Sequence, residues 1–210
     1  MLKLHSSPTS PYVRKVRVLL LETGLDAQVE HVITAVTPTS PNAALNMDNP
    51  LGKVPALQIE AGMALYDSPV ICEYLDSLHD GAKMFPTPGP ARWQALRRQA
   101  LGDGLLDAAI LGRYETALRP GEKLWPEWME AQMQKIDHSL VAMDREAGDL
   151  DGIVDIGTIT FACALGYLEF RYGDMDLRVT RPALAAWYDA FAQRPAMRAT
   201  EAPDGDPLKQ

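Results

Sequence analysis

Residues 49–57 have the sequence NPLGKVPAL, and the second proline of this stretch decides the fold. Pro55 opens a short apolar strand predicted at residues 56–59, where a proline donates no backbone hydrogen bond and restricts the backbone of Val54. We predict that the bond before Pro55 is cis, so that the N–H and C=O groups of Val54 turn outward and can pair with the main chain of a bound peptide. We therefore expect this turn to hold a ligand as well as to connect two elements.

Two other segments predict helix starts. Residues 65–69 (LYDSP) and residues 7–15 (SPTSPYVRK) each contain a serine followed by a proline. We expect Ser68 and Ser10 to be N-caps, with the proline after each as the first helical residue. Because the first N–H groups of a helix are unpaired and its dipole is positive at that end, such starts can bind carboxylates.

Together, the three segments resemble the N-terminal domain of cytosolic glutathione S-transferases, most closely their small bacterial YibF-like branch. The resemblance extends along nearly the whole chain. Its most specific part is the Lys-Val-Pro turn followed by Asp-Ser at a helix start. The resemblance implies the glutathione transferase fold, in which a thioredoxin-like α/β domain of order βαβ-ββα, with a mixed four-stranded sheet, precedes an all-α helical domain.

Length and composition are those of an ordinary globular protein. The 210 residues, 47% hydrophobic and 23% charged, allow a substantial core without disulfides or metals. The net charge of −8 is shared equally by residues 1–80 and 81–210, and no basic region predicts binding of nucleic acid. No apolar run reaches the roughly 18 residues of a membrane span, and no signal-peptide core follows Met1, so we expect a cytoplasmic protein. The four histidines lack metal-ligand spacing, and no metal site is predicted.

The resemblance implies that residues 1–80 form a thioredoxin-like glutathione-binding domain. Alternating and helical hydrophobic patterns, separated by turn residues, give the element order of this part of the chain. The predicted elements, in chain order, are a strand at 2–5, a helix from Pro11 to Gly24, a strand at 28–33, a loop with one irregular helical turn at 34–49, strands at 56–59 and 63–66 joined by a tight turn at 60–62, and a helix from Ser68.

Residues 81–90 predict a linker, because three of their last five positions are proline. The hydrophobic patterns of residues 91–210 indicate an all-helical domain, and the resemblance implies that this domain contributes the electrophile site. Its expected helices lie at 91–118, interrupted near Gly102 and Gly104, and at 126–146, 155–172 and 182–193. The third is apolar around most of its circumference, which indicates a buried central helix. In the resembling family this helix usually starts with a Ser/Thr-x-x-Asp capping box. Here Asp155 is present but Gly152 occupies the cap position, so we expect only a partial box, with Asp151 as a possible substitute cap.

Ser10 is the candidate catalytic residue. Conjugation needs the thiolate of glutathione, because a free thiol is mostly protonated at neutral pH. The Ser10 hydroxyl and the neighbouring N–H groups can stabilise a negative sulfur, and the resembling families keep their catalytic Ser or Cys at this position. Thr9 and Ser7 are alternatives for the thiol contact, and Ser10 also suits a plain N-cap.

Cys72 and Cys163 lie in apolar helical patterns without a Cys-x-x-Cys partner, which predicts buried free thiols.

The resemblance also implies which residues bind glutathione, the expected co-substrate; no tightly bound cofactor is expected. Val54 would hydrogen-bond the cysteinyl backbone and Lys53 would reach the glycyl carboxylate, while Pro55 shapes the turn. Ser68 and its N–H would hold the γ-glutamyl carboxylate, with Asp67 near the amine. Many relatives have Glu at the position of Asp67, and the shorter side chain makes its contact less direct.

The second substrate, a small electrophile, would lie where the first helix faces the helical domain. The candidate residues there, which helical packing and surface charge explain equally well, are Tyr12, Asp103, Asp107, Arg113 and Tyr114. Relatives pair through the last helix of the first domain, so we expect a homodimer that joins residues 68–79 of one subunit to residues 91–118 of the other. Asp103 would then approach the γ-glutamyl amine bound across the interface.

Three functions are compatible with these motifs. The first is a glutathione S-transferase that conjugates glutathione to small hydrophobic electrophiles, a detoxification reaction. The second is a glutathione-dependent thiol–disulfide oxidoreductase, against which Ser10 argues because a hydroxyl cannot form a mixed disulfide. The third is a non-catalytic binding or regulatory protein of the same fold, against which the complete set of glutathione-binding residues argues.

Overall fold

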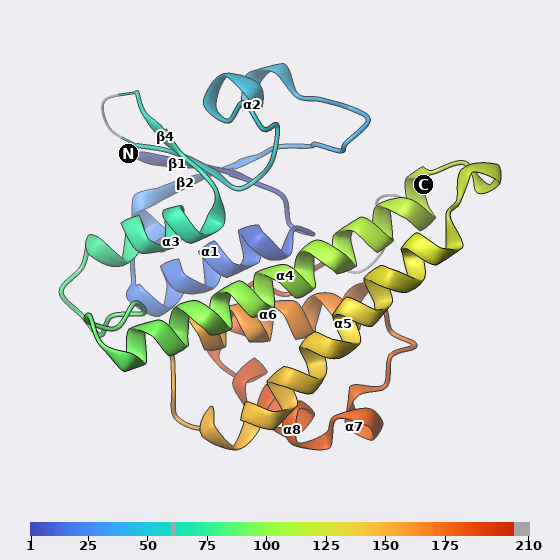
Figure 1. The fold of residues 1–210 in the computed structure, drawn as a ribbon. Helices are drawn as coiled ribbons and strands as arrows, with labels where there is room; N and C mark the ends of the chain where they lie inside the picture. Colours follow the sequence, from blue (N-terminus) through green and yellow to red (C-terminus); the bar gives the residue numbers. More distant parts are fainter. Residues whose placement is uncertain (60–61, 204–210) are drawn as a thin grey trace.

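The computed structural model, which describes residues 1–59 and 62–203, consists of a four-stranded sheet with its helices followed by a larger group of helices (Figure 1). The sheet has the order β2-β1-β3-β4, with β1 parallel to β2 and antiparallel to β3, and with β3 antiparallel to β4. The strands are β1 (Leu2–Ser6), β2 (Val29–Ile33), β3 (Ala56–Gln58) and β4 (Ala64–Leu65). The predicted order βαβ-ββα and the mixed sheet are confirmed. Glu60 and Ala61 of the predicted turn lie outside the described residues.

Helices α1 (Pro11–Thr23) and α3 (Ser68–Ser77) pack against each other below the sheet in Figure 1, and the short helix α2 (Ala43–Asp48) lies on the other side. The α1 helix ends where predicted, because Gly24 takes the left-handed conformation with φ of 72° and its N–H bonds the carbonyls of Leu20 and Leu21. The segment predicted as a loop with one helical turn contains α2, which Asn42 caps.

After α3 the elements of the described chain are helical, and residues 204–210 of the predicted helical domain lie outside the described residues. Its helices are α4 (Pro90–Leu118), α5 (Pro126–Glu146), α6 (Ile156–Arg171), α7 (Leu177–Thr180), α8 (Pro182–Ala192) and α9 (Pro195–Arg198), and short 3₁₀ turns occupy Asp26–Gln28, Gly121–Lys123 and Ala147–Asp149. The helices α7 and α9 were not predicted, because four residues give too little periodicity to detect. None of the helices among the described residues combines the length and the apolar character that crossing a membrane requires.

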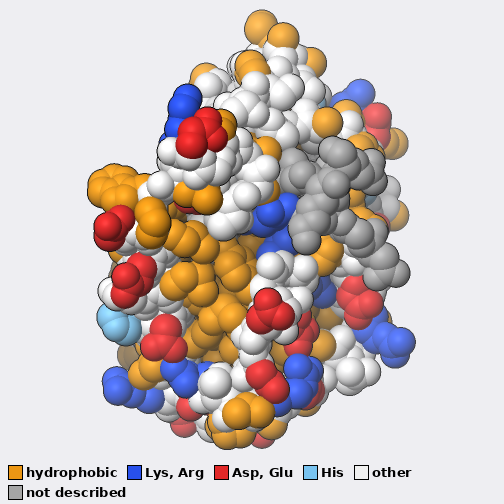
Figure 2. All heavy atoms as spheres, turned by 90° about the vertical axis from the view of Figure 1, so that its right-hand side faces the viewer, with side chains coloured by type: hydrophobic (Ala, Val, Ile, Leu, Met, Phe, Trp, Pro, Cys, Tyr) orange, Lys and Arg blue, Asp and Glu red, His pale blue; other side chains and the backbone are white. Residues whose placement is uncertain are grey.

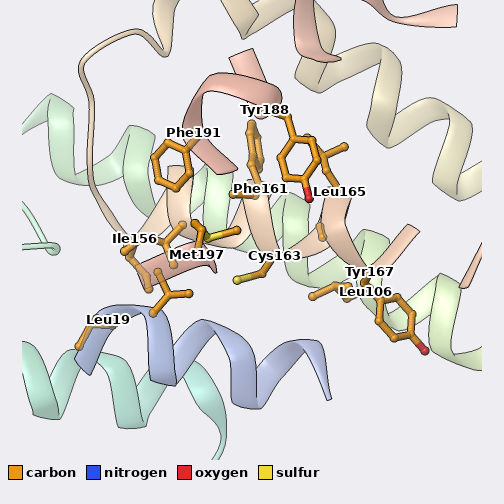
Figure 3. Packing of buried hydrophobic residues seen from close by; sticks show 14 of the residues in the cluster. Leu19, Leu106, Ile156, Phe161, Cys163, Leu165, Tyr167, Tyr188, Phe191 and Met197 are labelled. Carbon is orange, nitrogen blue, oxygen red and sulfur yellow. The ribbon is translucent and has the colours of Figure 1, made fainter. Parts of the chain in front are cut away.

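The central helix is α6, as predicted. Every residue from Ile156 to Leu168 is buried, and α6 contacts α4, α8 and α1. Figure 3 shows its side chains between α1 and α8: Phe161 lies near Tyr188, and Cys163 points toward α1. This apolar core joins the helical region to α1, so α1 is packed between the sheet and α6.

The segment between α3 and α4 is held against the first domain. The buried carboxylate of Asp76 in α3 accepts the backbone N–H groups of Met84 and Phe85 at 2.8 and 3.1 Å. The carbonyl of Met84 in turn accepts the N–H of Ile156, the first residue of α6, at 2.9 Å. Hydrogen bonds of this kind to a buried charge fix the path of the chain into the helical region.

The start of α6 corrects the predicted cap at Gly152. The N-cap is Asp155, whose carboxylate accepts the N–H of Thr158 at 2.9 Å, while the Thr158 hydroxyl accepts the N–H of Asp155 at 3.0 Å. The capping box is therefore complete and lies three residues later than predicted. Gly152 instead has a φ of 72° in the preceding turn, a conformation that favours glycine.

The predicted interruption near Gly102 and Gly104 is also wrong, because α4 is continuous from Pro90 to Leu118. At Gly102 the glycine serves packing: a Cβ there would lie 2.7 Å from Cγ2 of Thr160 and 3.4 Å from the ring of Phe161. The absence of a side chain lets α4 approach α6 closely. This requirement outweighs the intrinsic cost of a glycine in a helix, which is about 1 kcal/mol.

The two glycines of α4 should respond oppositely to alanine. We expect Gly102→Ala to lower the free energy of unfolding by about 1–3 kcal/mol, because the branched Thr160 side chain cannot move away without repacking. Gly104→Ala should raise it by about 0.5–1 kcal/mol, because Gly104 is exposed and no atom lies within 4 Å of its Cβ position. Urea unfolding of both variants measures the difference. Equal effects of the two substitutions would contradict the packing role of Gly102.

Candidate functional site

The three segments singled out in the sequence meet at one edge of the sheet. Strand β1 ends at Ser6, directly before the serine-rich turn. Strand β3 begins at Ala56, which pairs with His5 near the end of β1, so Pro55 lies beside this turn. Strand β4 runs antiparallel to β3 and ends next to its start, which brings Ser68 to the same edge.

Ser10 is the N-cap of α1, as predicted, and its hydroxyl oxygen accepts the N–H of Val13 at 3.3 Å. Because the oxygen acts as an acceptor in this bond, its proton remains available for donation away from the helix. The N–H of Ser10 donates to the carbonyl of Ser7 at 3.1 Å, and the hydroxyls of Ser7 and Thr9 are 3.4 Å apart. All three candidate hydroxyls for the thiol contact therefore lie within one turn, and each of these residues is half-buried.

A small pocket lies beside Ser10 and extends to α6. Its walls include Thr9, Ser10 and Arg14 from the α1 side and Tyr167 and Phe170 from α6. Figure 2, which shows the face that holds the N-terminal end of α1, has hydrophobic side chains in the recessed middle of this face and charged side chains around them. The aromatic walls suit an apolar substituent next to the Ser10 hydroxyl.

Sequence reasoning missed Tyr167 and Phe170 as site residues, because it assigned both to the apolar surface of the central helix. Burial raises the pKa of Tyr167, and the positive charges of Arg171 and Arg113 oppose that rise. Arg113, a predicted second-substrate residue, therefore lies near a wall of the pocket. The neighbouring candidate Tyr114 is half-buried, and burial raises its pKa as well.

The turn that carries Lys53 and Val54 is organised by Asn49. The side chain of Asn49 is buried; its amide donates to the carbonyl of Lys53 at 2.8 Å and accepts the N–H of Leu51 at 3.0 Å. Lys53 is exposed, Val54 is half-buried and Pro55 is buried. The bond between Val54 and Pro55 is cis, which confirms the expectation for this turn. The role of Asn49 was missed, although the Asn-Pro pair that begins this stretch marks a turn.

The start of α3 differs from the prediction by one residue. Asp67 has extended backbone and is the N-cap, whereas Ser68 is the first helical residue and is buried. The predicted cap role of Ser68 is therefore wrong, because its own backbone is already helical. The Asp67 side chain makes no capping hydrogen bond. In the first turn of α3 the N–H groups of Ser68 and Val70 can face an anion, whereas Pro69 has no N–H and that of Ile71 donates to the carbonyl of Asp67 at 3.1 Å. Asp67 is exposed beside this turn.

Three of the predicted second-substrate residues, Tyr12, Asp103 and Asp107, connect α1 to α4. Lys15 is completely buried, and its ammonium group lies 2.6 and 2.8 Å from the two carboxylate oxygens of Asp103. Burial raises the pKa of Asp103, while the Lys15 ammonium opposes this rise. The Tyr12 hydroxyl donates to Asp107, and burial together with this bond raises the pKa of Tyr12 far above its usual value. Tyr12 therefore stays protonated and engaged with Asp107 at neutral pH.

The comparisons with known proteins identify the family. Residues 4–83 match the family model described as glutathione S-transferase, N-terminal domain, and residues 126–190 match that of the C-terminal domain. The chain is 34% identical over 207 residues to the uncharacterized GST-like protein YibF of Escherichia coli (strain K12), covering 96% of this chain and 99% of that protein. The chain belongs to the glutathione S-transferase family.

Solved structures of other family members agree with this assignment. A glutathione transferase family member from Pseudomonas fluorescens Pf-5, with bound glutathione, has a TM-score of 0.95 and 49% identity over 97% of this chain and all of that chain. A glutathione S-transferase from Methylobacillus flagellatus KT, also with glutathione bound, has a TM-score of 0.89 and 35% identity over the same shares of the two chains.

Both cysteines of this glutathione S-transferase family member are remote from solvent. Cys72 in α3 and Cys163 in α6 are free and buried, as predicted. Burial raises the pKa of the Cys72 thiol to about 12 and that of Cys163 to about 11, although Lys15 lowers both and Arg14 lowers the latter. Neither thiol has the exposed, electropositive surroundings of a reactive cysteine.

We expect neither thiol to react with a disulfide reagent such as dithionitrobenzoate in the native protein at pH 8, because the thiolate is both inaccessible and strongly disfavoured. Both should react once the chain is unfolded in guanidinium chloride. Counting the released chromophore before and after unfolding measures this. One thiol that reacts rapidly in the native state would contradict the burial of the cysteines.

Proposed function

We propose that this chain is a glutathione transferase that conjugates the thiolate of glutathione to small hydrophobic electrophiles, an activity of the EC 2.5.1.18 type. The observation that carries the proposal is the position of Ser10. Its hydroxyl lies at the N-terminus of α1, on the sheet edge that also holds Val54 and Ser68, and beside a pocket with aromatic walls.

The proposed chemistry uses the free proton of the Ser10 hydroxyl. The bound thiol loses its proton to solvent, and Ser10 donates a hydrogen bond to the thiolate, which the positive end of the α1 dipole also favours. The sulfur lone pair then forms a bond to the electrophilic carbon; with an aromatic halide the carbon–halogen bond breaks, and the halide leaves with its electron pair into solvent. Thr9 and Ser7 remain alternatives for the sulfur contact, because their hydroxyls belong to the same turn.

The remaining site residues are proposed to hold the peptide part of glutathione. The backbone of Val54 pairs with the cysteinyl residue, and Lys53 attracts the glycyl carboxylate. Ser68 and the first N–H groups of α3 bind the γ-glutamyl carboxylate, with Asp67 beside the amine. Glutathione bound in the Pseudomonas and Methylobacillus structures supports this assignment. Glutathione is a co-substrate in this proposal, and no tightly bound cofactor takes part.

The pocket beside Ser10 is proposed to receive the electrophile. Tyr167 and Phe170 form its aromatic side, with Arg113 near Tyr167. A second structure of the Pseudomonas fluorescens protein, 46% identical to this chain over 97% of its length, holds S-(propanoic acid)-glutathione, whose sulfur carries a substituent. A substituent on sulfur at the Ser10 position would extend toward these walls. Asp103 and Tyr12 are proposed to fix α1 and α4 around the site, since both are engaged between these helices.

Residues 1–80 are proposed as the glutathione-binding domain, residues 81–90 as the linker and residues 91–210 as the helical domain.

Thiol–disulfide exchange is less well supported, because the two cysteines are buried and Ser10 occupies the helix start. Free thiols suit the reducing cytoplasm, where we propose that the protein acts. A non-catalytic binding protein remains the outcome if calorimetry detects glutathione binding but no electrophile from a panel is converted.

We expect Ser10→Ala to lower kcat with an aromatic halide about 10- to 100-fold, because a hydrogen bond to a charged sulfur contributes about 1.5–3 kcal/mol. The dissociation constant for glutathione should change much less, since the other contacts remain. Steady-state kinetics and calorimetry measure the two effects. Unchanged turnover in Ser10→Ala, with the loss in Thr9→Ala or Ser7→Ala instead, would assign the sulfur contact to that residue.

We also propose a homodimer in which residues 68–79 of one subunit contact residues 91–118 of the other. Both segments expose large hydrophobic side chains that the chain itself does not cover. Val70 is 47% and Trp93 is 70% exposed, and the ion pair between Glu73 and Arg92 joins the two segments at the same surface. Exposed apolar side chains flanked by charges are typical of a subunit interface.

Light scattering should therefore give twice the chain mass of 23.1 kDa at micromolar concentration. Trp93→Glu should weaken the dimer by about 2 kcal/mol or more, because a buried interface tryptophan is a typical hot spot. Trp125→Glu is the matched control, since Trp125 is 61% exposed but lies outside the proposed interface. A wild-type monomer, or equal effects of the two substitutions, would refute this interface.

A further inference from the structure

A buried histidine connects the sheet to the turn that carries Lys53 and Val54. His5 lies in β1 and is 8% exposed. Its Nδ1 is 2.9 Å from the hydroxyl of Thr34, and its Nε2 is 2.8 Å from a carboxylate oxygen of Asp48. The same oxygen of Asp48 also accepts the side-chain amide of Gln58 in β3. Asp48 is thus held from two adjacent strands.

Asp48 is the last residue of α2, and Asn49 follows it directly. Asn49 stabilises the turn that follows it with two hydrogen bonds. Its carbonyl accepts the N–H of Gly52 at 2.9 Å, and its side chain donates to the carbonyl of Lys53 at 2.8 Å. The turn is therefore internally ordered, and Asp48 attaches it to the sheet. We call residues 42–54 the glutathione arm.

Other attachments of the arm are few. Leu45 is the one buried residue of α2, whereas Met47 on the same helix is 86% exposed. The arm also lacks the cover of the helical region, since α2 lies on the opposite side of the sheet from α1 and α3 (Figure 1). A segment with one buried apolar anchor opens locally at a low free energy, so its polar anchor has a large influence on its position.

We propose that His5 is a positioning residue for glutathione binding, because its hydrogen bond to Asp48 fixes the arm that presents Lys53 and Val54. The inference rests on the proposed function of this site. It assigns a role to a side chain that does not touch the peptide: His5 acts through Asp48 and Asn49. Loss of the bond is expected to weaken binding of glutathione without slowing the chemical step at Ser10, which lies on a different element.

The direction of the decisive bond is fixed by chemistry. A carboxylate only accepts hydrogen bonds, so the Nε2 atom of His5 carries the proton that faces Asp48, whichever charge the ring has. Glutamine places its amide nitrogen near the position of Nε2, whereas asparagine reaches only the position of Nδ1, beside Thr34. Asparagine at this position can therefore keep only the hydrogen bond to Thr34, whereas glutamine can keep the hydrogen bond to Asp48 in the arm.

His5→Asn should raise the dissociation constant and the KM for glutathione about tenfold with kcat unchanged, as expected when one hydrogen bond that orders the site is lost. His5→Gln should stay within about twofold of the wild type, because the bond to Asp48 is kept. Calorimetry and steady-state kinetics measure these values. His31→Asn is the control, because the ring nitrogens of His31 in β2 lie 3.1 Å from Asp26 and 3.5 Å from the Ser6 hydroxyl, and neither partner belongs to the arm.

Amide hydrogen exchange without ligand gives a second readout. The N–H groups of Asn49, Leu51 and Gly52 should exchange faster in His5→Asn than in His5→Gln, while exchange in α1 stays the same. Equal exchange and equal affinity in the two variants would overturn the inference. A wild-type protein that binds no glutathione would instead refute the proposed function, and the exchange result alone would then decide whether His5 orders the arm.

Discussion

The buried ion pair between Lys15 and Asp103 is the constraint on which the relation of the two parts of the molecule depends. The ammonium group of Lys15 has no access to water. Burial of this charge is stable only because the Asp103 carboxylate of α4 lies at hydrogen-bond distance. Removing one partner of such a pair costs about 3–5 kcal/mol, because the other charge stays buried without compensation. Any rotation of α1 relative to α4 would break the pair. Ser10 caps the same helix five residues before Lys15, so this constraint also orients Ser10.

The position of Asp103 depends in turn on the packing of α4 against α6. Gly102 precedes Asp103 and lies against Thr160 of α6, so the two helices approach more closely than side chains would otherwise allow. This contact determines how far Asp103 lies from α1. The same α6 presents Tyr167 and Phe170 about two and three turns after Thr160, beside Ser10. One helix thus anchors the ion pair through α4 and forms a wall of the candidate electrophile pocket.

The peptide side of the site has a different physical basis. The apolar core and the ion pair position Ser10, whereas Lys53 and Val54 lie on a segment with little buried surface. Polar groups hold this segment, through Asp48 at the sheet and Asn49 within the turn. A weakly buried arm can adjust to a peptide ligand, while the element that acts on sulfur stays rigid. Separate anchors for the two functions allow affinity and turnover to change independently.

Local features of the chain were determined by the sequence alone. Ser10 with Pro11 starts a helix, Gly24 ends it, and Pro55 marks the turn, because each depends on the backbone preferences of a few neighbouring residues. The alternation of patterns around these signals was enough for the order βαβ-ββα. Capping was predicted less well: the caps fall at Asp67 and Asp155, because the choice among adjacent capping residues depends on where packing begins the helix.

Tertiary structure alone decided the features that join distant segments. The sequence suggested a break at Gly102 and purely structural roles for Tyr167 and Phe170, since a helical period shows which face is apolar but not what that face meets. The distance from Gly102 to Thr160, the pairing of Lys15 with Asp103 and the bond from His5 to Asp48 arise only when elements far apart in the chain pack together. Packing free energy and the need to pair buried charges, rather than local preference, determine these contacts.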